Sequence, residues 1–326
     1  MVRPFAGPLA RAGLAVLAAL APLSSPQAQA IDTLKMMVPA NAGGGWDQTG
    51  RNLASAMQSA NLVKKVTIDN KGGAGGTIGL AQFVNSAKGD PNAVMIAGMV
   101  MVGAIAMNSS PVNLTMVTPI ARLTGEYEVL VVPASSPLKD AKDLLAKFKA
   151  NPGSVSWGGG SAGGADHILA AMMAKTVGID GSKVNYIPSA GGGEGTSAVL
   201  GGHVTVGIAG YGEYAQLIHA GKLRALGISS DRRLPGVNVP TLKEQGIDVE
   251  LMNWRGIFGA PGLTAEQRSA LVKLVGDAVR SPAWQETLKK MDWVNLYLPG
   301  DEFAAAVGEE TKKVTAIIGD IGLAKK

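Results

Sequence analysis

Cysteine is absent from this 326-residue sequence, which excludes disulfide bonds, thiolate metal sites and a cysteine nucleophile. Aromatic residues make up 5% of the chain, and its basic residues form no run, although the formal net charge is +5. Because nucleic-acid binding requires clustered basic residues, that function is not expected. After residue 30, no apolar stretch reaches the roughly 20 residues needed to cross a bilayer.

The first 30 residues have the layout of a secretory signal peptide. Arg3 and Arg11 make a basic start, residues 13–23 are apolar, and Ala28-Gln29-Ala30 ends the segment with small residues. An apolar run of about 11 residues is too short to act as a membrane anchor. We therefore expect residues 1–30 to be removed and the mature protein to be exported.

Glycine is abundant, with 44 residues, and many of them gather in four loops. The loops are residues 43–45, 72–76, 158–164 and 191–195, and each lies between a short apolar run and a segment with helical character. Glycine lets the backbone approach a ligand closely and leaves amide N–H groups free. The following helix directs its positive dipole end to the same place. The pattern indicates a protein that holds a small anion through backbone amides.

Strand-like and helix-like segments alternate from residue 34 onward. The predicted strands are residues 34–38, 66–70, 93–97, 128–132, 155–157, 184–187, 204–209 and 223–228. The predicted helices are residues 47–60, 77–88, 99–107, 140–149, 166–177, 196–200, 213–220, 264–280, 282–291 and 301–318. Thr264 is a plausible N-cap. This order predicts an α/β fold with mostly parallel sheets flanked by helices.

The alternation restarts after a change in composition near residues 128–133, which predicts two similar domains. We assign residues 31–129 and 253–326 to domain 1, and residues 130–252 to domain 2, because the C-terminal helices can return to the first domain. Ligands of open α/β sheets bind at the carboxyl ends of strands, where all four glycine loops lie. We therefore expect a ligand cleft between domains that close about a hinge, as in periplasmic binding proteins.

Residues near the glycine loops have structural interpretations beside the functional ones. Asp47 and Arg51 are four residues apart and can pair on the helix surface, which we favour over a ligand contact for Asp47. Trp46 either flanks the cleft or packs between the domains. Thr77 is placed to cap its helix and offers a hydroxyl beside free amides. Lys71 is interpreted as a solvated charge at the end of a strand.

Enzymatic and nucleotide-binding functions have less support. The dipeptide Asp166-His167 opens a helix, but the other histidines lie on different predicted elements. We expect His167 to face its own loop rather than to act in catalysis or bind a metal. No loop contains the Gly-Lys-Ser/Thr of a P-loop. Asp69 is close to the acidic position of a dinucleotide fingerprint, but the first loop is a plain Gly-Gly-Gly. We predict no catalytic residue, cofactor or metal.

The sequence after the leader resembles, over essentially its whole length, the substrate-binding receptors of tripartite tricarboxylate transporters, also called Bug receptors. The resemblance rests on six landmarks in a fixed order. They are Pro39…Gly43-Gly44…Asp47…Arg51; the run from Asn70 to Gly79; Gly160-Ser161-Ala162-Gly163…His167; Gly191-Gly192…Leu200-Gly201-Gly202; the run from Gly221 to Leu226; and Trp254…Gly256…Pro261.

The resemblance implies a type II periplasmic-binding-protein fold that clamps a carboxylate between two domains through backbone amides and ordered waters. It implies delivery to a membrane permease with a large and a small integral subunit, and no catalysis. The implied first-domain contacts are Gly43, Gly44, Gly45, Trp46, Gly73, Ala74, Gly75, Gly76 and Thr77. The implied second-domain contacts are Ser161, Ala162, Gly163, Gly164, Ser189, Gly191 and Gly192.

Two departures from the family pattern affect the expected ligand contacts. Gly72 stands where a proline is common, and Ala190 stands where many members carry a lysine, which removes a possible cation. Arg255 supplies a positive charge instead, or else forms a fixed pair. The first loop inclines us to a di- or tricarboxylate such as citrate, with amino acids and aromatic acids left open. We expect the protein to be a monomer. The alternatives to a transport receptor are a sensory receptor that presents its ligand to a membrane kinase and, less favoured, an exported α/β enzyme.

Overall fold

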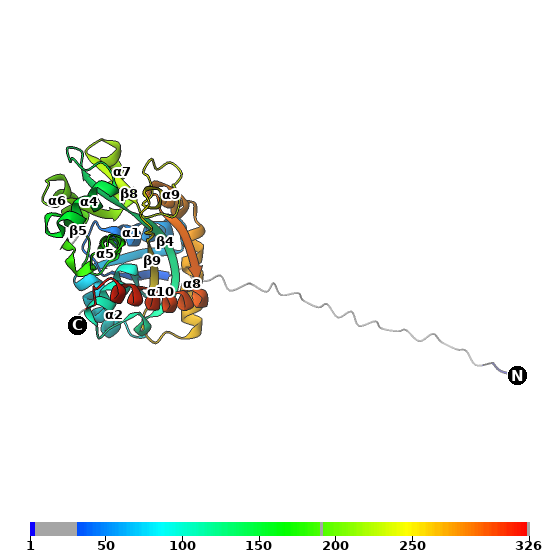
Figure 1. Cartoon of the computed structure of the whole chain (residues 1–326). Helices are drawn as coiled ribbons and strands as arrows, with labels where there is room; N and C mark the ends of the chain where they lie inside the picture. Colours follow the sequence, from blue (N-terminus) through cyan, green and yellow to red (C-terminus); the bar gives the residue numbers. More distant parts are fainter. Residues whose placement is uncertain (4–30, 190–191, 325–326) are drawn as a thin grey trace.

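The computed structural model describes residues 1–3, 31–189 and 192–324 (Figure 1). Most of the expected signal peptide lies outside these residues, as do Ala190 and Gly191. Within the described ranges, no helix combines the length and the apolar character that a membrane span requires.

Residues 31–108 form three βα units that build one end of the sheet. Strand β1 (Ile31–Val38) lies between β2 (Val63–Asn70) and β3 (Ala93–Gly98), and both pairings are parallel. The intervening helices are α1 (Gly45–Ser59), α2 (Thr77–Ser86) and α3 (Met99–Asn108). All six residues of β3 are buried, because helices cover both faces of the sheet at this strand.

The second half of the chain builds the other end of the sheet in the same way. Strand β5 (Ser156–Gly159) pairs in parallel with β6 (Asn185–Pro188) and with β7 (Val206–Gly210), and β8 (Leu223–Ile228) lies beside β4. The helices are α4 (Ala141–Ala150), α5 (Ala165–Thr176), α6 (Gly192–Leu200) and α7 (Tyr211–His219). In Figure 1, α4, α6 and α7 lie in the upper part of the molecule, whereas α5 lies near its middle, close to α10.

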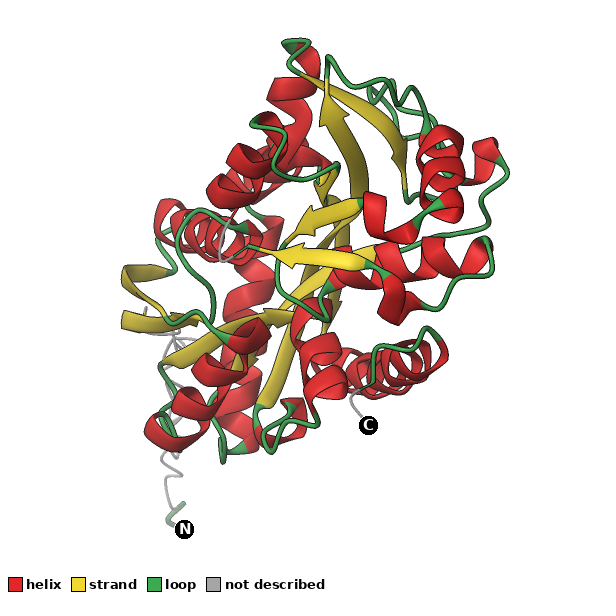
Figure 2. Cartoon of the chain, turned by 60° about the vertical axis from the view of Figure 1, so that its left-hand side comes forward, coloured by secondary structure: helices red, strands yellow, loops and turns green. Residues whose placement is uncertain are grey.

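Strand β4 (Thr118–Pro133) connects the two halves. Its first part pairs antiparallel with β9 (Met252–Gly259) and β10 (Val294–Pro299), and its last part pairs antiparallel with β7 and β8. In the described part of the chain the strand order is β2-β1-β3-β9-β4-β7-β5-β6. Figure 2 shows the strands running through the centre with helices around them. We propose that the boundaries at residues 129/130 and 252/253, within β4 and at the start of β9, separate two domains.

Three C-terminal helices return to the first half of the sheet. They are α8 (Ala265–Arg280), α9 (Pro282–Lys290) and α10 (Gly300–Asp320). Helices α8 and α9 pack against α1, and α10 packs against α3 and β4. Thr264 caps α8 in a reciprocal capping box with Gln267, which confirms the predicted N-cap. The end of α10 also reaches the second half, where Asp320 pairs with Lys175 of α5.

The predicted α/β class, with sheets flanked by helices, is confirmed, but the strand pairing is mixed rather than mostly parallel. The parallel pairs come from the predicted βαβ units. Strands β9 and β10 and the first part of β4 were not predicted, and they pair antiparallel. These segments carry polar residues such as Arg122, Asn253 and Arg255 among their apolar ones, so they lack a continuous apolar run, and the alternation at the start of β9 was overlooked.

Candidate functional site

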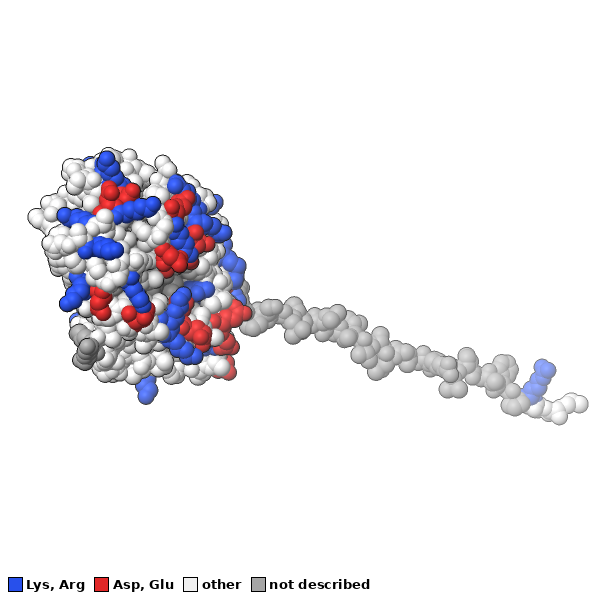
Figure 3. Space-filling model, in the orientation of Figure 1, with Lys and Arg blue, Asp and Glu red and all other residues white. Residues whose placement is uncertain are grey.

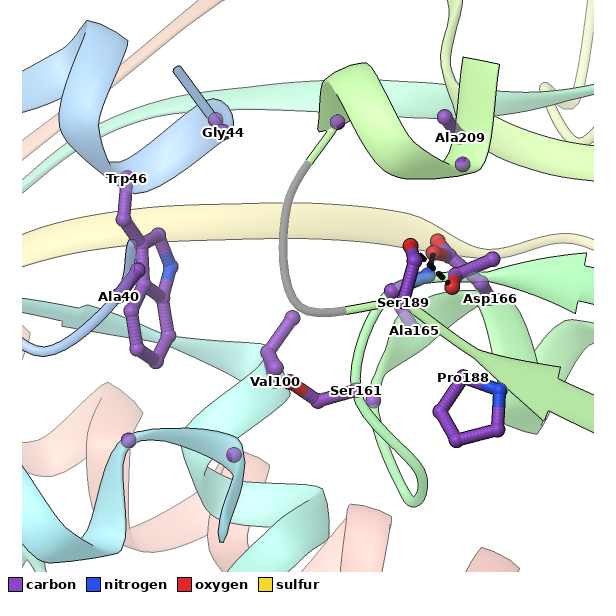
Figure 4. A pocket seen from close by; sticks show the side chains of 18 of the residues that line it. Ala40, Gly44, Trp46, Val100, Ser161, Ala165, Asp166, Pro188, Ser189 and Ala209 are labelled. Carbon is purple, nitrogen blue, oxygen red and sulfur yellow. Dashed lines mark hydrogen bonds between the residues drawn. The ribbon is translucent and has the colours of Figure 1, made fainter. Parts of the chain in front are cut away.

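A cavity of about 870 Å³ lies where the glycine loops of the two halves of the chain meet. This volume falls within the range of about 300–1,000 Å³ that is typical of small-ligand sites. Figure 4 shows Ala40, Gly44 and Trp46 from the first half on one side of the cavity, and Ser161, Ser189 and Asp166 from the second half on another. The cavity therefore lies in the predicted position, between the two proposed domains.

The helices that begin at this cavity lack side-chain caps. Helices α1, α2 and α5 begin after Gly44, Gly76 and Gly164, and none of these N-cap residues has a side chain that accepts a hydrogen bond. Three helices elsewhere in the chain, α4, α8 and α9, are capped by the side chains of Asp140, Thr264 and Ser281, whereas α10 begins after Pro299 without such a cap. The N-cap residues of α1, α2 and α5 thus supply no side-chain acceptor to the first-turn amides, and the helix dipoles favour a negative charge at the same place.

The glycine loops face one another in pairs across the cavity. A Cβ atom on Gly44 would lie 4.0 Å from the backbone nitrogen of Gly192, and one on Gly192 would lie 3.6 Å from the carbonyl oxygen of Gly43. A Cβ atom on Gly75 would lie 3.9 Å from Cβ of Ser161. The absence of side chains at these positions allows the two halves to approach this closely.

Most of the predicted ligand contacts line the cavity. They are Gly44, Gly45, Trp46, Gly73, Ala74, Gly75, Gly76, Ser161, Ala162, Gly164, Ser189, Gly192 and Arg255. Gly191 lies outside the described residues. The remaining three predicted contacts are Gly43, Thr77 and Gly163, and they do not line it. The amide of Gly43 donates to Asp47 Oδ2, and that of Gly163 donates to His167 Nδ1.

Two local predictions about the helix starts were wrong. Thr77 does not cap α2, because Gly76 occupies the cap in a left-handed conformation and the Thr77 hydroxyl donates to the carbonyl of Ala74. Residues 192–195 of the predicted fourth loop form the first turn of α6. Glycine disfavours a helix by about 1 kcal/mol per residue, which made a loop the natural prediction. In the structure the hydroxyl of Thr196 donates to the carbonyl of Gly192 within this turn.

Trp46 and Asp47 support the first glycine loop. Asp47 is buried, and its carboxylate accepts hydrogen bonds from the Gly43 amide, Arg51 Nε and Asn70 Nδ2. The predicted pair with Arg51 is thus confirmed, and Asp47 holds the loop rather than facing the cavity. Trp46 flanks the cleft, and its buried Nε1 has no hydrogen-bond partner within the described part of the chain.

The third glycine loop is held by the start of α5. Asp166 Oδ2 accepts from the amide of Gly160, and the hydroxyl of Tyr186 donates to the carbonyl of the same residue. His167 stacks on Tyr186, with ring centroids 4.2 Å apart. Burial lowers the pKa of His167 to about 4, so its ring is neutral and Nδ1 can accept from Gly163. His167 therefore faces its own loop, as predicted.

The sequence analysis missed a group of acidic residues at the cavity. Asp166 and Glu213 line it, and Glu128 is fully buried behind them. Burial raises the pKa of Asp166 to about 6 and that of Glu213 to about 7, and it raises the pKa of Glu128 well above the usual range. Neighbouring carboxylates add to these increases for Glu128 and Glu213, because like charges disfavour ionisation. Asp166 and Glu213 each follow a strand and a glycine, which was the available sequence signal.

Arg255 lines the cavity, but its charge is already paired. Its guanidinium forms a buried ion pair with Glu126, and both side chains are 3% exposed. Arg255 Nη1 lies 3.4 Å from Thr49 Oγ1, and the guanidinium carbon lies 5.3 Å from the ring centroid of Trp293. Of the two roles predicted for Arg255, the structure shows the fixed pair.

Replacement of Glu213 by glutamine tests the shifted pKa of this residue. Folded Glu213 titrates near pH 7 and the unfolded chain near its ordinary value of 4.5, so the folded state retains a proton that the unfolded state loses. The stability of the wild type therefore falls through this window as the pH rises. We expect the stability of E213Q relative to the wild type to increase by roughly 2 kcal/mol between pH 5 and pH 8 in ligand-free protein. Urea unfolding at a series of pH values measures it.

The control for this experiment is E286Q, which removes an exposed carboxylate from α9. Its stability relative to the wild type should stay constant over the same pH range. If the difference in stability between E213Q and the wild type also stayed constant with pH, the pKa of Glu213 would not be raised on folding.

Charges on the outer surface are distributed differently from those at the cavity. Figure 3 shows Lys and Arg intermixed with Asp and Glu on the face it presents, without a patch of one sign. Within the described ranges, no group of three or more His, Asp or Glu side chains is arranged to hold a metal ion.

Comparisons with known proteins agree on one family. A family model described as "Tripartite tricarboxylate transporter family receptor" matches residues 50–323. The "UPF0065 protein in gbd 5'region" of Cupriavidus necator is 32% identical to this chain and covers 97% of it and 98% of its own length. Protein BugT of Bordetella pertussis is 27% identical over 89% of each chain.

Solved structures give the same result. The periplasmic binding protein BugD has a TM-score of 0.80 at 24% identity, covering 90% of this chain and 99% of its own. A TctC solute binding protein from Polaromonas has a TM-score of 0.65 at 27% identity, covering 89% of this chain and 98% of its own. The matched family consists of substrate-binding receptors, not enzymes, and its members are periplasmic binding proteins. The chain belongs to the tripartite tricarboxylate transporter receptor family.

Proposed function

We propose that this protein captures a small carboxylate in the cavity and delivers it to a tripartite tricarboxylate permease in the membrane. The observation that carries the proposal is the convergence of α1, α2 and α5 on one cavity with glycine N-caps that lack side-chain acceptors. We propose that the amides at these helix starts bind the carboxylate oxygens. The predicted class of ligand, a di- or tricarboxylate such as citrate, is part of this proposal.

The energies of such contacts are sufficient for a receptor. One helix start favours an anion by about 0.3–1 kcal/mol, and by up to about 2 kcal/mol in a partly buried position. Several helix starts acting on one desolvated carboxylate, with hydrogen bonds to the amides, can reach the roughly 8 kcal/mol of a micromolar complex. Since Arg255 is neutralised by Glu126, these donors replace a free cation in our proposal.

Two structural neighbours hold carboxylates. MatC from Rhodopseudomonas palustris was solved with malate, at a TM-score of 0.78 and 20% identity. Another R. palustris protein was solved with adipate, at a TM-score of 0.78 and 19% identity. At this identity the likeness extends to the fold, so the two ligands define compounds to test rather than the ligand of this chain.

Calorimetry on the purified protein tests the proposed function. The protein is first unfolded, dialysed and refolded to remove any ligand that copurifies with it. It is then titrated with dicarboxylates, citrate, amino acids and aromatic acids. We expect at least one carboxylate to bind with a Kd in the micromolar range or below. Failure of every carboxylate to bind the refolded protein, with native circular dichroism, would contradict the proposal.

A further inference from the structure

The cavity offers two kinds of groups to a ligand. One region contains donors: the amides at the start of α2 near Gly76, and the Nε1 group of Trp46, whose ring packs against Gly76. Trp46 is 6% exposed and its Nε1 has no partner within the described part of the chain. Figure 4 shows this nitrogen on the side of the ring that faces the middle of the cavity. A carboxylate group of a ligand would accept hydrogen bonds from the donors of this region.

The other region contains acceptors. Asp166 and Glu213 line it, and Oε2 of Glu213 lies close to Gly192, where a Cβ atom would be 2.7 Å away. Asn253 also lines the cavity and is 6% exposed, and its Oδ1 has no partner among the described residues. This unsatisfied amide oxygen requires a donor.

The described residues of the cavity supply no free positive charge to balance this region. Among the described residues that line the cavity, Arg255 is the one Lys, Arg or His side chain, and Glu126 already neutralises it. Behind Asp166, the carboxyl group of Glu128 is fully buried and interacts with the side chains of Asp166 and Asn253, so it adds a further acidic group and no cation. A second carboxylate of a ligand would therefore be repelled here, whereas a cation with several N–H donors would be attracted.

We propose that the ligand is a carboxylate that also carries a protonated amine, and that Asp166, Glu213 and Asn253 hold the ammonium group. The three N–H donors of an ammonium group match three acceptors from three separate elements, the starts of α5 and α7 and the strand β9. The inference rests on the proposed function, because it takes the carboxylate capture as given and specifies the rest of the ligand.

Burial raises the pKa of both Asp166 and Glu213, and the nearby Asp166 carboxylate adds to the increase for Glu213, which agrees with this inference. An ammonium group would reverse the effect, because an opposite charge favours the ionised form. Binding should therefore release protons to the solvent near pH 6–7, where these two groups titrate.

Paired ligands test the proposal. The refolded protein is titrated at pH 7.5 with ω-amino acids of two to six methylenes, and with dicarboxylates that have the same numbers of methylenes. The best ω-amino acid is expected to bind at least tenfold tighter than the dicarboxylate of equal length. Calorimetry in two buffers of different ionisation enthalpy, repeated at pH 6.5, should show proton release for the amino acid.

Single variants test whether the acidic residues act on ligand binding rather than on folding. D166N and E213Q should each weaken binding of the best ω-amino acid at least tenfold. Dicarboxylate binding should stay unchanged or become stronger in E213Q, which leaves the hydrogen bond between Asp166 and the Gly160 amide in place. The control D248N removes an exposed acid of the second half and should bind as the wild type does. Circular dichroism confirms that each variant is folded.

The outcomes distinguish this inference from the proposed function. Dicarboxylates that bind as tightly as the ω-amino acids, or more tightly, would overturn the ammonium site and leave carboxylate capture intact. Retention of ω-amino acid affinity in both D166N and E213Q would also overturn it. If neither series, nor any other carboxylate, binds the refolded protein, the proposed function fails and this inference fails with it.

Discussion

Replacement of Arg255 by methionine is expected to lower the free energy of unfolding by about 3–5 kcal/mol, because it leaves Glu126 buried without its partner. Both side chains are 3% exposed, and Arg255 also contacts Thr49 and the ring of Trp293. Burial lowers the pKa of Arg255 to about 9, which leaves it charged at neutral pH. Urea unfolding followed by circular dichroism measures the change.

The surroundings of this ion pair explain why neither partner can move to solvent. A Cβ atom on Gly45 would overlap the guanidinium, and one on Gly210 would overlap the Glu126 carboxylate. Gly45 belongs to α1 and Gly210 to β7, so residues from both halves of the chain enclose the pair. The carboxylate left in R255M is therefore desolvated on both sides, and the variant should lose stability rather than rearrange.

Two further variants identify the cause of the loss. K312M breaks a surface pair with Glu309, in which the two side chains are 77% and 76% exposed, and should cost less than about 1 kcal/mol. The double variant E126L/R255M removes both charges and should recover most of the stability lost in R255M, because an apolar pair of similar volume needs no solvation. A loss of about 1 kcal/mol or less in R255M would show that the pair is not buried as described.

The parts of the fold that the sequence could predict are those set by local rules. Strand β3 is a continuous apolar run between turn residues, and Thr264 with Gln267 forms a capping box that depends on a spacing of three residues. The glycine loops could be placed at the cavity because a glycine run between a strand and a helix occurs at the carboxyl end of the strand.

The residues at the crossing of the two halves could not be predicted in this way. Glu126 and Glu128 lie on β4, and Asn253 and Arg255 lie on β9. Charged residues of this kind usually indicate exposed positions, since burial of an unpaired charge is unfavourable. For Glu126 and Arg255, the partner that permits burial lies 129 residues away along the chain, and the register of β4 and β9 brings the two together.

The acidic residues of the cavity were missed for a different reason. Asp166 and Glu213 lie in the first turns of α5 and α7, where an acid is expected simply because it favours the helix dipole. That local explanation is sufficient for an exposed helix start. It became insufficient once the structure brought both carboxylates to one cavity beside the buried Glu128.

Replacement of Gly44 by leucine is expected to weaken carboxylate binding at least 100-fold, or about 2.7 kcal/mol, without unfolding the protein. Gly44 has φ −82° and ψ 174°, an extended conformation that any residue adopts. A Cβ atom there would meet no heavy atom closer than the Gly192 nitrogen at 4.0 Å. The leucine side chain would therefore enter the space between the two facing loops, where it occupies the cavity and keeps the loops apart.

A graded series separates this effect from general destabilisation. Leucine in place of glycine at an N-cap costs the fold about 1 kcal/mol, which unfolding experiments can measure separately. G44A adds one methyl group and should reduce affinity less than G44L. The matched control is G193L in the facing helix α6, because Gly193 does not line the cavity and a Cβ there would meet nothing within 4 Å. Calorimetry with the tightest carboxylate compares the three variants. Wild-type affinity in G44L would place the carboxylate outside this cavity, because a leucine there leaves no room for a ligand between the first loop and α6.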